Sequence, residues 1–215
     1  MVPRRLEVFL LGCVAMLSVP LITAAAIHVG FRMAYFLYIG LTLSRRQEKE
    51  DSYDEWLRFK KRASLIINAD GLTLFLVMVF SATSLQLPAS FKWTFAIGTI
   101  LSVVGVGVKL AAYRVVGAKG YYWYNFFCDG DEREYAARGV YKYMDNPMYT
   151  LGYLHAFGLA LIFRSLWGLA FSLFDWAVIW AFYYYFESQH TRFHREQVTS
   201  FSSRHFEVDS LSQEN

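Results

Sequence analysis

Long hydrophobic runs separated by compact polar blocks dominate this chain. Residues 6–43, 63–87, 91–116 and 148–186 are almost continuously apolar, whereas the segments between them hold most of the charge. A transmembrane helix needs roughly 20 apolar residues, and a soluble domain would show helical or strand periodicity instead. The pattern predicts an all-α, polytopic transmembrane helical bundle.

The lengths of the runs indicate about five spans, with six possible. The run 91–116 follows 63–87 after only three residues, which predicts a helical hairpin. The run 148–186 is about twice the length of one crossing, and Arg164 and Ser165 near its middle mark a turn. The first run suits one long helix with Pro20 inside it, or two minimal spans.

These boundaries define one integral membrane domain, 1–215. We divide it into the first span region 6–43, an amphipathic linker 44–62, a helical hairpin 63–116, a loop 117–147, a second hairpin 148–187 and a tail 188–215. The linker suits either a helix in the headgroup layer or a solvated segment. Residues 4–26 have features of a signal peptide, but the apolar run continues to 43, so we expect a retained span.

Lysine and arginine are distributed unequally between the two sides that an odd number of spans defines. The segments 44–62, 114–147 and the tail after 187 hold seven, five and three of them, against four on the other side. Positive charge favours cytoplasmic loops. We therefore expect these segments and the C-terminus in the cytoplasm.

Composition adds few constraints on function. Hydrophobic residues make up 55% and aromatic residues 19% of the chain, and the formal net charge is only +3. That charge suits cytoplasmic loops and gives no argument for a nucleic-acid partner. Cys13 and Cys128 form neither a disulfide framework nor a CxxC metal site, and we expect no metal.

The most specific local feature is the stretch 141–149, Tyr-Lys-Tyr-Met-Asp-Asn-Pro-Met-Tyr, with Gly152 after it. It enters the apolar run 148–186, and Glu187 lies at the end of that run. If the run turns back at its middle, both ends reach the same face of the membrane. We therefore expect Asn146 and Glu187 to lie close enough to contact one ligand.

These residues resemble the phospholipid methyltransferase family, which includes phosphatidylethanolamine N-methyltransferases and, more distantly, isoprenylcysteine carboxyl methyltransferases. The resemblance extends from Gly105 to Glu196, somewhat under half of the chain. It rests on the motifs Gly105-Val106-Gly107, Gly120-Tyr121-Tyr122 and Asp145-Asn146-Pro147-Met148-Tyr149 with Gly152. The family often has two adjacent acids after the last span, whereas here Ser188 follows Glu187.

The resemblance implies S-adenosyl-L-methionine as cofactor. In this reading Asn146 and Pro147 open a helix whose first amides bind a carboxylate, and tyrosine rings face the sulfonium or the adenine. Glu187 would accept from the ribose or the cofactor ammonium. The candidate cofactor-binding residues are Gly105, Gly107, Tyr141, Asn146, Pro147, Tyr149 and Glu187. The structural alternatives are a helix cap, an interfacial aromatic belt and close helix packing at the glycines.

Two further groups are candidates for contact with the substrate. Lys109 lies within a span, and we expect it to pair with Asp70 or to bind a lipid phosphate or the cofactor carboxylate. Snorkelling towards the membrane surface is the alternative. Tyr122 and Trp123 begin an aromatic cluster that suits either a cage for a quaternary ammonium or a membrane anchor.

The implied reaction is N-methylation of phosphatidylethanolamine toward phosphatidylcholine. A lipid amine must lose a proton to attack a methyl group, and the candidate bases are Asp145, His155, Glu187 and His190. Carboxyl methylation of a prenylated cysteine is one alternative. A non-catalytic scaffold or transporter, in which Asp70, Lys109 and Asp175 line a path, is another. The expected location is a bacterial inner membrane or the endoplasmic reticulum, with the site at the cytoplasmic face; the oligomeric state stays open.

Overall fold

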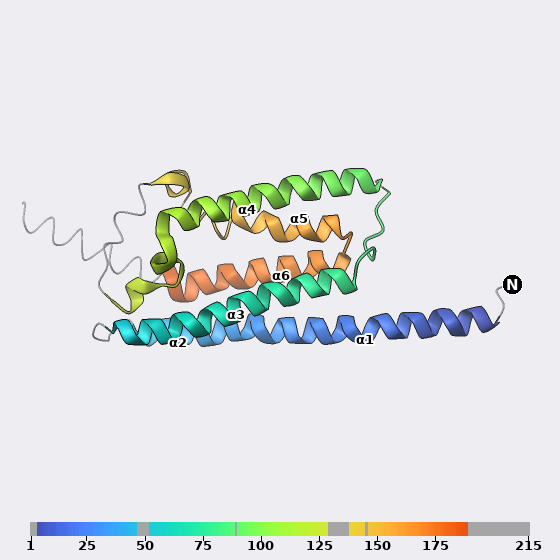
Figure 1. Cartoon of the computed structure of the whole chain (residues 1–215), viewed down its shortest axis with the longest axis horizontal. Helices are drawn as coiled ribbons and strands as arrows, with labels where there is room; N and C mark the ends of the chain where they lie inside the picture. Colours follow the sequence, from blue (N-terminus) through green and yellow to red (C-terminus); the bar gives the residue numbers. More distant parts are fainter. Residues whose placement is uncertain (1–3, 47–51, 89, 129–137, 145, 189–215) are drawn as a thin grey trace, which may run out of the picture.

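The computed structural model describes residues 4–46, 52–88, 90–128, 138–144 and 146–188, with side chains from residue 18 onward in the first of these segments. Within these ranges every regular element is a helix and none is a strand (Figure 1). The prediction of an all-α bundle is confirmed. The helices run side by side along one long axis, and α1 extends beyond the rest at its N-terminal end.

The first hydrophobic run forms one long helix. Helix α1 (Arg4–Ala34) continues through a π-helical segment (Tyr35–Ile39) into α2 (Gly40–Ser44). Pro20 lies inside α1. Residues Ser18–Ser44 are long and apolar enough for a single crossing. The alternative of two minimal spans in this run therefore has no support among the described residues.

Three further helices are long and apolar enough to cross a membrane, and a fifth apolar helix is shorter. The long ones are α3 (Tyr53–Phe80), α4 (Phe91–Tyr121) and α6 (Leu166–Phe182), the last continued by a π-helical segment (Tyr183–Glu187). Residues 53–62, which we assigned to a linker, form the first turns of α3.

The shorter helix is α5 (Leu154–Ile162), preceded by a 3-10 turn (Leu151–Tyr153). At 1.5 Å per residue, its apolar stretch of 12 residues rises about 18 Å, well below the ~30 Å of a bilayer core. The second hairpin therefore joins one partial helix to one full span.

The predicted turn at Arg164 and Ser165 is present. Arg164 has a φ of 49°, in the left-handed region, and reverses the chain between α5 and α6. Ser165 then caps α6, because its hydroxyl accepts from the amide of Gly168 at 2.7 Å. The same hydroxyl lies 2.6 Å from that of Ser81, which follows α3, so both hairpins are tied together at this end of the bundle.

Glycines allow α4 and α5 to pack closely. A Cβ on Gly158 would lie 2.5 Å from the carbonyl oxygen of Gly98, and a Cβ on Gly105 would meet the backbone nitrogen of His155. Contacts between small residues are a usual means of helix association in membranes. On the other side of the bundle, α1 packs against α3, and α3 packs against α6.

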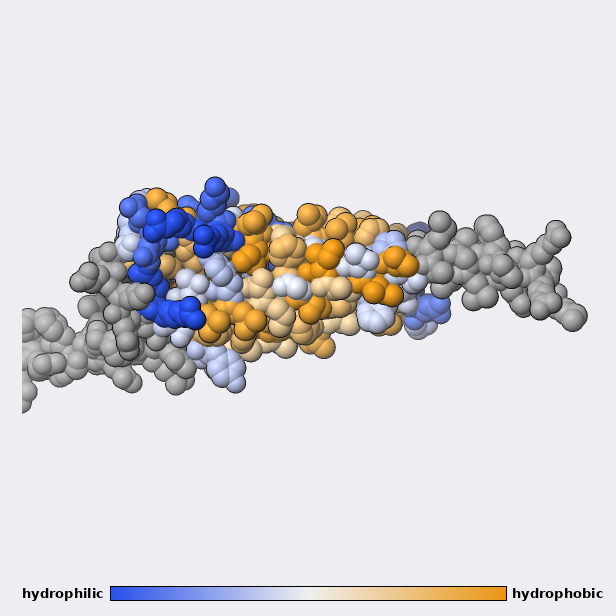
Figure 2. Space-filling view, turned by 90° about the horizontal axis from the view of Figure 1, so that it is seen from below, coloured by the Kyte–Doolittle hydropathy of each residue, from blue (hydrophilic) through white to orange (hydrophobic). Residues whose placement is uncertain are grey.

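The surface is divided as a membrane protein requires. Figure 2 shows hydrophobic residues along the body of the bundle and hydrophilic residues gathered mainly at the end where α3 begins. Arg58, Lys61 and Arg62 are exposed there. Which leaflet this end faces stays a prediction from the loop charges.

Candidate functional site

The Asn-Pro-Met-Tyr motif forms a series of tight turns and does not begin an α-helix directly. The amides of Tyr149 and Thr150 both donate to the carbonyl of Asn146, at 3.2 and 3.1 Å. The amide of Gly152 donates to the carbonyl of Pro147 at 2.8 Å. The prediction that amides after Pro147 are free to bind a carboxylate is therefore wrong for these three, because local turns use them.

The motif turn is attached to the far end of α6. The indole of Trp176 donates to the carbonyl of Tyr149 at 2.9 Å. The hydroxyl of Tyr149 lies near Glu187 and Tyr35, which both influence its pKa, and the ring of Tyr149 lies 6.4 Å from that of Tyr183. The two ends of the run 148–187 thus meet at one end of the bundle, as the proposed hairpin requires.

Glu187 influences the tyrosines around it. Burial raises the pKa of Tyr141 to about 12, and the charge of Glu187 adds to the shift. Burial, followed by the charge of Glu187, also raises the pKa of Tyr149 well above its ordinary value. Both hydroxyls therefore stay protonated near neutral pH and can act as hydrogen-bond donors.

Trp123 is placed beside Glu187 but inside the core. Its indole nitrogen donates to the Glu187 carboxylate at 3.2 Å. Its ring packs against Tyr35, Phe59 and Phe182, and only 5% of its surface is exposed. Trp123 thus orients the acid and is enclosed by other rings, which suits the anchor interpretation better than an open cage for a quaternary ammonium.

Tyr122 lies nearer the surface than Trp123. Its carbonyl accepts from the indole of Trp56 on α3 at 3.1 Å, and Lys60 lies over its ring at 5.8 Å. These contacts again suit an anchor that joins the end of α4 to α3.

A second group of predicted residues lies where α4 meets the start of α5. Gly105 packs on His155, whereas Gly107 is exposed and a Cβ there would meet nothing within 4 Å. The side chain of Lys109 passes over Gly152, with its ammonium 5.5 Å from the ring centre of Tyr153. Close packing thus accounts for Gly105, and Gly107 faces outward.

His155 presents one ring nitrogen to the backbone. Its Nδ1 lies 2.7 Å from the carbonyl oxygen of Gly152, and a carbonyl can only accept, so Nδ1 carries a proton in this contact. In the neutral ring Nε2 is then the acceptor. This tautomer is the one that a base would need.

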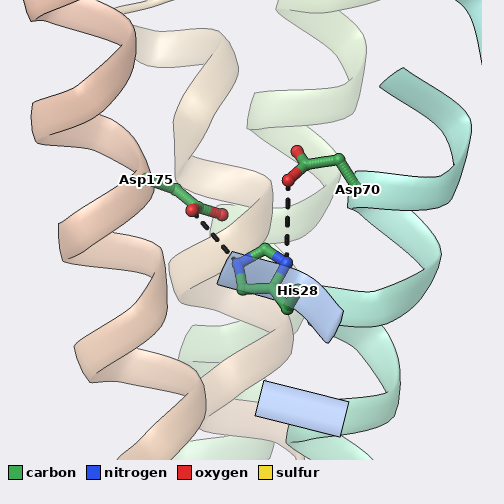
Figure 3. A group of neighbouring side chains, drawn as sticks. All are labelled: His28, Asp70 and Asp175. Carbon is green, nitrogen blue, oxygen red and sulfur yellow. Dashed lines mark hydrogen bonds and ion pairs between the residues drawn. The ribbon is translucent and has the colours of Figure 1, made fainter. Parts of the chain in front are cut away.

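A buried ionic cluster lies deeper in the bundle. His28 and Arg32 of α1, Asp70 of α3 and Asp175 of α6 are all buried. Arg32 pairs with Asp70 at 2.6 Å and with Asp175 at 2.8 Å. Figure 3 shows the ring of His28 between the two carboxylates, 3.1 Å from Asp175 and 3.6 Å from Asp70.

Asp70 and Lys109 lie close enough for their charges to attract, but among the described residues they form no direct ion pair. The carboxylate of Asp70 pairs with Arg32 instead, and within the described part of the chain Lys109 has no ion pair. We predicted the pair because both residues lie at a similar depth in neighbouring spans. Depth alone does not tell whether the two side chains lie on the helix faces that pack together. Asp70 is directed towards α1, whereas Lys109 is directed towards Tyr153 at the start of α5.

Both ring nitrogens of His28 lie at hydrogen-bond distance from side chains of other helices. Its Nδ1 lies 3.1 Å from the hydroxyl of Thr73, which donates to backbone carbonyls of α3. Its Nε2 lies 3.1 Å from Asp175, and a carboxylate accepts. His28 thus joins α1 to both α3 and α6 within the cluster.

His28, Asp70 and Asp175 also offer three ligand atoms within 4.8 Å of one another, a spacing that could hold a metal ion. The two carboxylates lie at opposite ring nitrogens of His28 (Figure 3), and Arg32 already pairs with both. A metal would have to displace the guanidinium. The arrangement therefore fits an internal ion-pair cluster better than a metal centre.

His28 and Arg32 were not among the predicted site residues. They are four positions apart, one turn of a helix, within an otherwise apolar run. Two ionisable residues on one face of a membrane helix are a signal for a buried partner. Of the other predicted residues, Asp145 and His190 lie outside the described part of the chain, and their roles stay predictions.

The geometry defines a polytopic helical membrane protein with aromatic and acidic side chains converging at one end of the bundle. Comparison with protein families is more specific, since residues 93–194 match the family model described as phospholipid methyltransferase. The chain therefore carries a domain of the phospholipid methyltransferase family, and the resemblance noted in the sequence is confirmed.

Curated proteins include several similar fungal enzymes. A phosphatidylethanolamine N-methyltransferase of Saccharomyces cerevisiae is 33% identical over 162 residues, which are 74% of this chain and 18% of that protein. A phosphatidylethanolamine N-methyltransferase of Lachancea thermotolerans is 34% identical over 116 residues, 54% of this chain and 14% of that protein.

A phosphatidylethanolamine N-methyltransferase 1 of Vanderwaltozyma polyspora is 30% identical over 166 residues, 77% of this chain and 20% of that protein. The chain thus spans a fifth or less of the length of these relatives. No solved structure matches it.

Proposed function

We propose that this chain methylates the amine of phosphatidylethanolamine, toward phosphatidylcholine, with S-adenosyl-L-methionine as the methyl donor. The observation that carries the proposal is that the Asn-Pro-Met-Tyr motif meets the end of α6 that carries Glu187, since Trp176 donates to the carbonyl of Tyr149 and the ring of Tyr149 lies 6.4 Å from that of Tyr183. It brings the two family motifs to one place at the end of the bundle. The names of the fungal relatives support phosphatidylethanolamine as the substrate. Because these relatives are yeast proteins, the endoplasmic reticulum is favoured over a bacterial membrane as the location.

The side chains at this end fit the proposed cofactor. Glu187 provides a carboxylate for a ribose or an ammonium group, and Tyr141 and Tyr149 provide hydroxyls and rings beside it. When bound, the cofactor supplies an electrophilic methyl group on a sulfonium cation. Asn146 and Pro147 shape the turn that holds Tyr149 against α6, so we assign them a supporting part at the same site.

Lys109 and His155 suit the lipid side of the reaction. The ammonium of Lys109 has no ion pair among the described residues, so it is available to a lipid phosphate. His155 holds Nε2 as an acceptor, and a base is needed because only a neutral amine attacks the methyl carbon. With the cofactor bound there to supply the methyl group, His155 would take the proton that the amine loses as it is methylated.

The direct test is methyl transfer by the purified full chain in phosphatidylethanolamine vesicles with radiolabelled S-adenosylmethionine. We expect label in N-methylated lipids. Glu187→Gln should weaken binding of the demethylated cofactor at least about tenfold, since a hydrogen bond to a charged group contributes about 1.5–3 kcal/mol. The matched control is Glu55→Gln, because Glu55 pairs with Arg46 on a more exposed surface.

The other outcomes separate the alternatives. Label in a prenylcysteine analogue instead of lipid would favour carboxyl methylation. A folded protein that binds neither the cofactor nor its demethylated product would favour the scaffold or transporter. Unchanged binding in Glu187→Gln would remove Glu187 from the site.

A further inference from the structure

The guanidinium of Arg32 touches residues that lead to both parts of the candidate site. Its Nη2 donates to the hydroxyl of Tyr153 at 3.3 Å, and its carbon Cζ lies 5.5 Å from the ring centre of Tyr35. Arg32 is only 4% exposed. A buried side chain with several fixed partners has little freedom to move relative to either tyrosine.

Tyr35 leads to the part of the site that we assign to the cofactor. Its hydroxyl lies near that of Tyr149, and its ring lies 6.4 Å from that of Trp123. Trp123 and Tyr149 are in turn the side chains that hold Glu187. One aromatic residue therefore separates Arg32 from the groups that contact the carboxylate.

Tyr153 leads to the part that we assign to the lipid. The ammonium of Lys109 lies over its ring at 5.5 Å, and the ring of His155 lies 6.0 Å away at a steep angle. Again one aromatic residue separates Arg32 from the two groups. The guanidinium thus occupies the junction between the two halves of the site.

The acids of α3 and α6 fix the guanidinium itself. Asp70 binds Nη2 at 2.6 Å and Asp175 binds Nε at 2.8 Å, so the planar group is held from two helices. His28 lies between these carboxylates and holds them in turn (Figure 3). Lysine could not make the same contacts, because its single ammonium lacks the planar fork of arginine.

We propose that Arg32 is a positioning residue for methyl transfer, which sets the separation between the bound cofactor and the lipid headgroup. The proposal rests on the proposed function. Two reactants must be held within about 3–3.5 Å and aligned, and a displacement of 1 Å can lower the rate about 10²-fold. It follows that α1, which lies outside the segment 93–194 matched by the family model, completes the site.

The test compares three variants of the full chain in phosphatidylethanolamine vesicles. Arg32→Lys keeps the positive charge but not the fork, and we expect kcat to fall 10- to 100-fold. The affinity for the demethylated cofactor and the KM for the lipid should change less than threefold. Tyr153→Phe removes only the hydroxyl that accepts from Arg32. We expect a 3- to 10-fold loss of kcat, because Arg32 then no longer holds Tyr153 in place.

The structural control is Ser81→Ala, which removes the buried hydroxyl that lies 2.6 Å from that of Ser165, after the end of α3 and away from Arg32 and its acids. We expect it to lower the unfolding temperature while kcat at a permissive temperature stays within twofold. A purely structural role for Arg32 would make loss of activity follow loss of stability in all variants.

The outcomes are separable. Wild-type kcat in both Arg32→Lys and Tyr153→Phe would overturn the inference while leaving the proposed function intact, and Tyr153→Phe decides the matter if Arg32→Lys does not fold. A loss of kcat in Ser81→Ala as large as in Arg32→Lys, at equal stability, would also overturn it. A wild-type protein without cofactor binding or lipid methylation would overturn the proposed function, and the inference with it.

Discussion

Two helix interfaces in this molecule are held together by opposite means. Helices α4 and α5 approach through glycines, so that a single added Cβ on Gly158 would collide with the backbone of α4. Helices α1, α3 and α6 are instead joined by charged side chains around Arg32. Small residues fix how near two helices can come, whereas the ion pairs fix how three helices are rotated relative to one another.

The difference corresponds to the two halves of the candidate site. The glycine interface carries Lys109 on α4 and His155 at the start of α5. The ionic interface carries Arg32 and leads through Tyr35 to Glu187. A reaction between two bound molecules needs both the distance and the rotation to be right, and each interface controls one of them.

Removing the central cation should have the largest effect on stability. Arg32→Met leaves Asp70 and Asp175 buried without their guanidinium. Removing one partner of a buried ion pair lowers the free energy of unfolding by about 3–5 kcal/mol. We expect a loss of this size when unfolding is measured by denaturant titration in mixed micelles. The double variant Arg32→Met/Asp175→Asn removes one of the stranded charges and should recover part of the loss. Wild-type stability in Arg32→Met would contradict the ionic basis of this interface.

A methyl group at the glycine interface should have an intermediate effect. In Gly158→Ala the new Cβ would lie 2.5 Å from the carbonyl oxygen of Gly98, so backbone has to move. Overpacking of this kind costs about 1–3 kcal/mol. Gly71→Ala is the matched control, since a Cβ there meets nothing within 4 Å, and alanine favours a helix over glycine by about 0.8–1 kcal/mol. Equal unfolding midpoints for the two variants would show that the close approach is not needed.

The smallest effect should come from a neutral member of the ionic interface. Thr73→Val keeps the shape of the side chain and removes the oxygen that lies 3.1 Å from Nδ1 of His28. The net contribution of such a hydrogen bond is about 0.5–1.5 kcal/mol, and Asp70 remains beside the same nitrogen. The same denaturant titration measures it. A loss as large as that of Arg32→Met would mean that the charges are not what orders this interface.

The sequence predicted the class of fold well because bilayer crossing depends on length and hydrophobicity, which are local properties. Tight turns were predicted where their residues are distinctive, as at Arg164 and Ser165. The contact between Tyr149 and Glu187 was accessible to the same reasoning, since a hairpin must return its ends to one face.

The ion-pair partners of the charged residues inside the membrane could not be predicted from local sequence properties. Asp70 and Asp175 stood out as ionisable residues in apolar runs, but their common partner is Arg32 on α1. Which side of a helix faces which neighbour depends on packing around the whole bundle, and the run 6–43 gave two possible span counts. The local turns at 146–152 were missed for a related reason, because Pro147 is compatible with both a helix start and a 3-10 turn.

Both helices that lead to Glu187 contain a π-helical segment, Tyr35–Ile39 in the first and Tyr183–Glu187 in the last. The two segments meet, since Phe36 and Phe186 contact edge to face at 5.3 Å and Phe186 packs on Gly40. A π segment accommodates one extra residue, and one residue corresponds to about 100° of helical rotation. Loss or gain of one amino acid within Tyr183–Glu187 would therefore turn Glu187 away from the tyrosines, and the same change within Tyr35–Ile39 would turn Tyr35 away from Glu187. Among homologous proteins, the number of residues in these two helices should consequently vary less than the identity of their apolar residues.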